Sequence, residues 1–163
     1  PEFLDAPIMK LKDFGVSFDV GDNFIRVNGK ASVLKAAKIQ TLPYPGFPTD
    51  LQAPFGVLAT QAKGSSLIFD IMYEGRLKYI NELKKMGADA VILDPHRAII
   101  NGPTVLEGAE IESLDLRAGA TLVIAALLAK GKSVIGNIEQ IDRGYEKLDE
   151  RLAKLGADIK RIN

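Results

Sequence analysis

The sequence contains no cysteine, no tryptophan and a single histidine, His96. Without cysteine, the 163 residues contain no disulfide, no thiolate metal site and no cysteine nucleophile. One histidine argues against a histidine-based catalytic triad and against a multi-histidine metal site. We therefore expect neither a bound metal nor a cofactor.

The chain also lacks an excess of charge of either sign. It has 21 Lys and Arg against 21 Asp and Glu, so its formal net charge is zero. Nucleic acids and anionic membrane surfaces attract a basic field that this chain does not carry. We therefore expect neither as a partner.

Long hydrophobic runs are missing as well. The longest apolar stretch, 118–129, is interrupted by Gly119 and Thr121 and is too short to span a bilayer. We recognise no signal-peptide pattern at the start of the chain and expect the cytoplasm as the default compartment. The chain does not open with Met either, and residues 1–3 resemble a cloning remnant. We expect a piece of a longer protein.

What is present is an ordinary globular composition, with 47% apolar and 26% charged residues. Its most informative feature is an internal repeat. Three segments recur in the same order, and the offset between copies grows slowly, as short loop insertions would cause. Residues 50–53 match 115–118, 62–64 match 129–131, and 86–89 match 155–158.

Each copy predicts the same succession of elements. An Asp precedes a long apolar helix, a Lys-Gly ends it, and a strand, an Arg-bearing loop, a second helix and a closing strand follow. The first copy has helices at 51–62 and 79–86 and strands at 65–70, 90–93 and 98–101; the second has helices at 116–129 and 145–155 and strands at 132–136 and 158–162.

The N-terminal stretch matches the back half of a further copy, with Ile8, Leu11 and Phe14 on the buried face of a helix. We therefore expect one truncated domain over 1–163, with about two and a half repeats. Residues 4–44 form the incomplete unit, and 45–111 and 112–163 form the next two. A truncated repeat exposes an apolar edge, which favours self-association.

The two long helices differ in their sequences. The helix at 116–129 is apolar nearly all round, which predicts burial on every side, with sheets outside it. The helix at 51–62 contains Pro54 near its first turn, so we expect a tight or distorted start there.

Four polar residues occupy equivalent places in the two copies. Asp50 and Asp115 precede the long helices, and Arg76 and Arg143 precede the second helices. Helix N-termini attract anions, phosphate above all, so this end of the domain is a candidate anion site. Helix capping alone would explain both aspartates. The arginines oppose the helix dipole, and their guanidinium groups suit phosphate and carboxylate.

Four motifs, in this order and spacing, resemble the enolpyruvyl transferase family. They are Pro-Gly-Phe-Pro-Thr-Asp-Leu-Gln at 45–52, Tyr-Glu-Gly-Arg at 73–76, Asp-Leu-Arg-Ala at 115–118 and Ile-Asp-Arg-Gly-Tyr-Glu at 141–146. The resemblance runs from about Leu4 to the C-terminus. It implies an inside-out α/β domain of βαβαββ-type units, with buried helices, outer sheets and a partner domain across a cleft.

The resemblance also implies a function. It is closest to the member that transfers the enolpyruvyl group of phosphoenolpyruvate to the 3′-hydroxyl of UDP-N-acetylglucosamine in peptidoglycan precursor synthesis, releasing phosphate. Asp50 would accept the proton of the sugar hydroxyl or orient it. Arg76, Arg117 and Arg143 resemble the residues that bind the phosphate and carboxylate of phosphoenolpyruvate and respond to closure. Met72 matches a position whose backbone contacts the nucleotide sugar.

The chain departs from the family pattern in two places. A Lys-Asn pair and a mobile loop with Cys or Asp, which hold phosphoenolpyruvate and supply the acid in the family, have no counterpart here. They belong to the missing N-terminal domain, so the parent is expected to be an enzyme and this chain alone to be inactive. Two alternatives stay open: a fragment of the shikimate-pathway enolpyruvyl transferase, and a non-catalytic anion-binding or scaffold domain.

Overall fold

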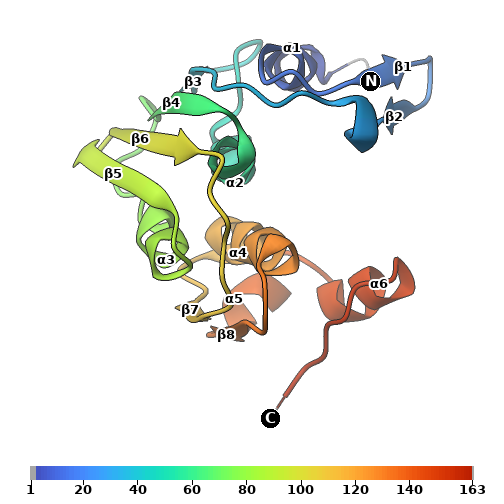
Figure 1. Ribbon diagram of the computed structural model, residues 1–163, viewed down its shortest axis with the longest axis vertical. Helices are drawn as coiled ribbons and strands as arrows, with labels where there is room; N and C mark the ends of the chain where they lie inside the picture. Colours follow the sequence, from blue (N-terminus) through green and yellow to red (C-terminus); the bar gives the residue numbers. More distant parts are fainter. Residues whose placement is uncertain (1–2, 163) are drawn as a thin grey trace.

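The computed structural model describes residues 3–162 (Figure 1). Its α-helices are α1 (Asp5–Asp13), α2 (Gln52–Gln61), α3 (Tyr79–Lys85), α4 (Leu116–Leu128), α5 (Glu139–Asp142) and α6 (Leu148–Lys154). Its strands are β1 (Phe18–Val20), β2 (Ile25–Val27), β3 (Ile39–Gln40), β4 (Gly64–Phe69), β5 (Asp89–Asp94), β6 (Arg97–Gly102), β7 (Glu110–Glu112) and β8 (Val134–Gly136). Two short 3₁₀ helices are η1 (Gly29–Ala31) and η2 (Thr49–Leu51).

The largest sheet has the strand order β3-β4-β6-β5. Strand β3 runs parallel to β4, and β6 is antiparallel to both β4 and β5. Two smaller sheets consist of the antiparallel pair β1-β2 and the parallel pair β7-β8. In the repeat, β7 and β8 correspond to β3 and β4.

Helices α2, α3 and α4 pack against one another on the inner side of the largest sheet (Figure 1). Along the β5-β6 hairpin, Ala90, Ala98 and Ile100 are buried against these helices, whereas Val91 and Leu93 face outward and are exposed. The expected arrangement of inner helices and an outer sheet is therefore confirmed.

The structure repeats one local device in three places. Helices α1, α3 and α6 are each followed by a glycine with a left-handed backbone, Gly15 at φ 78°, Gly87 at 90° and Gly156 at 97°. Only glycine adopts this conformation without strain, and it ends a helix by this turn. The division of the chain at 45 and 112 stays a prediction.

Two expectations for the second complete copy are wrong. Helix α4 is not buried on every side, because Ile124, Leu127 and Leu128 are 44–51% exposed. Residues 158–162 form no strand. A cavity of about 510 Å³, lined by Leu127, β8 and 158–162, lies between α4 and this segment, so the segment forms no ladder of hydrogen bonds with β8 and leaves Leu127 open. Ile124 and Leu128 lie outside the cavity lining and are not covered by any other part of residues 3–162.

Candidate functional site

Three of the predicted site residues meet at one end of the helix layer. Asp50 lies in η2, Arg76 in the loop before α3, and Arg117 in the first turn of α4. Oδ1 of Asp50 is 2.9 Å from Nη1 of Arg76 and 3.3 Å from Nη1 of Arg117. The structure therefore joins both copies of the repeat through one carboxylate.

The two equivalent aspartates do different things. Asp115 is the N-cap of α4, since its Oδ1 accepts hydrogen bonds from the backbone N–H groups of Arg117 (2.8 Å) and Ala118 (3.1 Å). The capping interpretation is confirmed there. For Asp50 it is wrong, because the Asp50 residue lies inside a 3₁₀ turn and its carboxylate, 64% exposed, points to the arginines.

The start of α2 is tight, as Pro54 predicts: η2 runs directly into the α-helix. Phe47 fixes the segment in front of it. Its side chain is buried and meets the Phe55 ring edge-on at 5.0 Å, and its carbonyl accepts a hydrogen bond from the N–H of Leu42. Asp50 therefore lies three residues after Phe47, a side chain that is fixed in the core.

Arg76 is held from three sides. Its Nη1 donates to Oγ1 of Thr49 at 2.8 Å as well as to Asp50. The ring of Tyr73 lies 4.0 Å from its guanidinium carbon, a cation–π contact. Its backbone carbonyl accepts a hydrogen bond from Nε2 of Gln52 at 3.2 Å. The side chain is only 18% exposed, so the guanidinium is preorganised.

Gln52 is itself fixed by Tyr79, whose hydroxyl donates to Oε1 of Gln52 at 3.2 Å. Burial raises the pKa of Tyr79, and the charge of Asp70 raises it further, so the phenol keeps its proton and remains a donor. Gly56 makes room for it, because a Cβ there would lie 2.2 Å from the hydroxyl. The amide of Gln52 is thereby turned toward Arg76.

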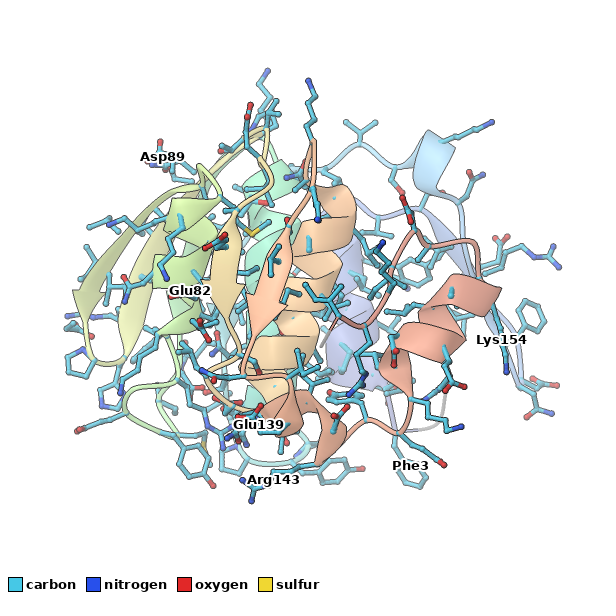
Figure 2. All side chains as sticks on the ribbon, turned by 90° about the horizontal axis from the view of Figure 1, so that it is seen from below. Phe3, Glu82, Asp89, Glu139, Arg143 and Lys154 are labelled. Carbon is cyan, nitrogen blue, oxygen red and sulfur yellow. The ribbon has the colours of Figure 1, made fainter. Side chains whose placement is uncertain are left out.

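Among residues 3–162, neither Arg143 nor Met72 forms a hydrogen bond with Asp50, Arg76 or Arg117. Arg143 follows α5, and its Nη1 is 3.4 Å from Oε1 of Gln140. Figure 2 shows Arg143 and Glu139 at one end of the molecule, with Asp89 toward the opposite end. Met72 donates its backbone N–H to Asp70 at 2.9 Å. The roles of Arg143 and Met72 stay predictions.

Sequence reasoning missed the residues that support Arg76. These are Thr49, Gln52, Asp70, Tyr73 and Tyr79. Thr49 and Gln52 flank Asp50 in the quoted motif, so their position was a usable signal. Asp70 and Tyr79 reach the site only through tertiary packing, for which the sequence carries no local sign.

The site is marked by its chemistry and not by its volume. The pocket bounded by Asp50, Arg76 and Arg117 is shallow, and none of the three lines the cavity of about 510 Å³. Across residues 3–162, no group of three or more His, Asp or Glu residues is placed to hold a metal ion. No helix in the same range has both the length and the apolarity to cross a membrane.

This arrangement can bind an oxyanion beside a hydroxyl group. Arg76 uses only Nη1 for its side-chain hydrogen bonds within residues 3–162, so the rest of its planar fork can hold a phosphate or carboxylate. The exposed ion pairs of Asp50 contribute little stability and can be exchanged for a ligand. The Asp50 carboxylate can then accept a hydroxyl proton.

Known proteins resemble this chain in sequence and in fold. The family described as EPSP synthase (3-phosphoshikimate 1-carboxyvinyltransferase) matches residues 3–152. Curated proteins named UDP-N-acetylglucosamine 1-carboxyvinyltransferase are similar: that of Magnetococcus marinus is 46% identical over 99% of this chain, and that of Thermodesulfovibrio yellowstonii is 47% identical over 99%. The chain spans 38% of the length of each of these relatives.

Solved structures show the same fold. The enolpyruvyl transferase NikO from Streptomyces tendae superposes with a TM-score of 0.89 at 30% identity, covering 96% of this chain and 36% of that one. EPSP synthase from Acinetobacter baumannii superposes with a TM-score of 0.71 at 21% identity, covering 99% of this chain and 41% of that one. At that identity the second likeness concerns the fold alone.

Proposed function

The chain belongs to the enolpyruvyl transferase family of EPSP synthase, and from this premise we propose that it is part of a transferase acting on UDP-N-acetylglucosamine. The enzyme moves the enolpyruvyl group of phosphoenolpyruvate to the 3′-hydroxyl of the sugar and releases phosphate. The observation that carries the proposal is the contact of Asp50 with Arg76 and Arg117 at the helix ends. The names of the relatives at 45–47% identity support the acceptor.

Each site residue has a part in the proposed reaction. Asp50 accepts the proton of the attacking hydroxyl or orients it. Arg76 and Arg117 bind the phosphate and carboxylate of phosphoenolpyruvate, and their fixed positive charge stabilises charge that develops during transfer. Arg143 joins them when the cleft closes, and the backbone of Met72 contacts the nucleotide sugar.

The rest of the parent enzyme is the proposed partner. Because the chain spans 38% of the Magnetococcus relative, we assign the acid and the remaining phosphoenolpyruvate contacts to the part that lies outside this chain. The isolated chain should then bind anions weakly and show no turnover. The product would be a peptidoglycan precursor made in the cytoplasm.

A second acceptor follows from the description of the matching family, which names 3-phosphoshikimate. The proposed site would serve that reaction with the same arginines, because both reactions use an anionic enolpyruvyl donor. The identity of the acceptor hydroxyl separates the two candidates.

The test is a phosphate-release assay with phosphoenolpyruvate and either UDP-N-acetylglucosamine or 3-phosphoshikimate. It is run on this chain alone and on this chain mixed with the N-terminal part of the Magnetococcus relative. We expect release only in the mixture and only with the nucleotide sugar. Asp50→Ala should lower the rate at least about 100-fold, because it removes the proton acceptor.

Asp89→Ala is the matched control, since it removes an exposed carboxylate at the start of β5, which accepts a hydrogen bond from Asn101 and lies toward the opposite end of the molecule from Arg143 (Figure 2). It should leave the rate unchanged. Turnover by the chain alone would contradict a site shared with the rest of the parent enzyme. Phosphate release with 3-phosphoshikimate only would mean that 3-phosphoshikimate, and not the nucleotide sugar, is the acceptor. No release from a folded mixture would leave a binding domain without chemistry.

A further inference from the structure

Asp70 is a fully buried carboxylate that the proposed reaction does not use. It directly follows β4, and its backbone is fastened to the turn between β5 and β6. Its N–H donates to the carbonyl of His96 at 2.8 Å, and its carbonyl lies 2.7 Å from Nδ1 of the same histidine. The position of this carboxylate is therefore set by the sheet.

Four donors converge on the Asp70 side chain. They are the hydroxyls of Thr41 (2.9 Å) and Thr49 (2.6 Å) and the backbone N–H groups of Met72 (2.9 Å) and Tyr73 (3.3 Å). An ionised carboxylate can only accept hydrogen bonds and has room for about four. Three of these donors lie on Oδ1, and Thr49 alone donates to Oδ2, so the surroundings of Asp70 suit a carboxylate that only accepts hydrogen bonds.

Asp70 fixes the orientation of the Thr49 hydroxyl, because the carboxylate can only accept its proton. A hydroxyl has one proton, and that of Thr49 is taken by Asp70. Its oxygen lone pairs then face Nη1 of Arg76, which donates to them at 2.8 Å. The same guanidinium nitrogen reaches Asp50 at 2.9 Å. A series of hydrogen bonds therefore connects the buried carboxylate of Asp70, through Thr49 and Arg76, to the exposed carboxylate of Asp50.

We propose that Asp70 is a positioning residue of the site, which acts through Thr49 to hold the Arg76 guanidinium in the orientation that receives the anionic group of phosphoenolpyruvate. The use of that anion rests on the proposed function, whereas the positioning itself is a property of this chain. Thr41 donates to the same carboxylate, accepts a hydrogen bond from the N–H of Ile71 and forms none with Arg76 among residues 3–162, so it serves as an internal control.

The first readout needs no activity. In the chain labelled with ¹⁵N, the heteronuclear NOE of Arg76 Nε reports how firmly the guanidinium is held, and exposed Arg151 gives the reference for a free one. Thr49→Val should lower the Arg76 value toward the Arg151 level, part of the way because Asp50 and the Tyr73 ring still contact the guanidinium. Thr49→Ser keeps the hydroxyl and should restore the wild-type value, and Thr41→Val should leave it unchanged.

Asp70→Asn tests whether the Asp70 carboxylate sets the orientation of the Thr49 hydroxyl. The amide that this substitution introduces can donate to Thr49 and turn the hydroxyl proton toward Arg76, so the folded variant should behave as Thr49→Val does. Should Asp70→Asn fail to fold, the contrast between Thr49→Val and Thr41→Val still decides, because both remove one donor from the same carboxylate.

The second readout is the KM for phosphoenolpyruvate in the mixture that turns over. Thr49→Val should raise it about 10-fold or more, the loss expected for one hydrogen bond to a charged group, and Thr41→Val less than about twofold. Equal effects of the two variants on both readouts, or an unchanged Arg76 NOE in Thr49→Val, would overturn the proposal. An NOE loss in a protein that never turns over would uphold the positioning and reject the proposed function.

Discussion

The two copies of the repeat place an aspartate before a long helix, and the two aspartates have diverged in use. Asp115 closes the first turn of α4 with two backbone hydrogen bonds. Asp50 caps no helix. It lies inside the 3₁₀ turn η2, and its carboxylate contacts Arg76 and Arg117. Asp115 also lies 3.3 Å from Nε of Arg117 and lines the same shallow pocket, so the two carboxylates share this arginine and differ in that only Asp115 caps a helix.

The sheets of the two copies also differ, in the number of paired strands and in how deeply their side chains are buried. Strand β4 lies between two partners, β3 and β6, whereas β8 pairs with β7 alone among residues 3–162. Ile68 and Ile135 occupy equivalent positions, opposite Ile39 and Ile111. Ile68 is fully buried, but Ile135 lines the cavity and is partly exposed. The copy that contains Asp50 and Arg76 is also the better packed one.

The largest expected effect tests this packing difference. Ile68→Ala should lower the free energy of unfolding by about 4 kcal/mol, because it leaves a void in a closed core, and Ile135→Ala by only about 1–2 kcal/mol. Urea unfolding followed by circular dichroism measures both. Equal losses would mean that the two sheets contribute alike, and adding the N-terminal part of the relative should raise the Ile135→Ala loss if that part covers the cavity.

A smaller effect separates the two aspartates. Asp115→Ala should cost about 1 kcal/mol of unfolding free energy through loss of the N-cap. Asp50→Ala should change it by less than about 0.5 kcal/mol, since exposed ion pairs contribute little. The same urea titrations give both values. A larger loss for Asp50→Ala than for Asp115→Ala would reverse the assignment of the structural and chemical roles.

Local sequence patterns predicted the helices and strands well where the hydrogen bonds of the element join residues that are near in sequence. The helix at 51–62 appears as Gln52–Gln61, the strand at 65–70 as Gly64–Phe69, and the hairpin strands at 90–93 and 98–101 appear within a residue or so of their predicted ends. The strand predicted at 158–162 is missing, because a strand exists only with a hydrogen-bonding partner, which the local sequence does not specify.

The candidate site could be predicted only in part for a related reason. Motif spacing pointed to Asp50, Arg76 and Arg117, and the structure brings them together. Thr49 and Gln52 contact Arg76. They are themselves hydrogen-bonded to Asp70 and Tyr79, and these two residues lie elsewhere in the sequence and reach the site through packing. A buried carboxylate at the end of a strand looks in sequence like any polar residue that ends one.

The smallest expected effect concerns the segment across the cavity. Arg161 binds Asp142 at 2.8 and 2.9 Å and Asp149 at 3.4 Å, which holds residues 158–162 against α5 and α6. The hydrogen bonds from Arg161 lower the pKa of both carboxyls. A lowered pKa in the folded state stabilises docking above the unfolded value of about 4, and this contribution is lost as the pH falls through the folded value.

The methyl chemical shifts of Ile159 and Ile162, followed from about pH 6 to about pH 2, should therefore move together below about pH 4. Arg161→Met should abolish this step by releasing the segment at every pH. Lys160→Met removes the same charge one residue away and should preserve the step, because Arg161 alone forms these ion pairs. A step that survives in Arg161→Met would show that the apolar lining of the cavity, and not the ion pairs, docks this end of the second copy.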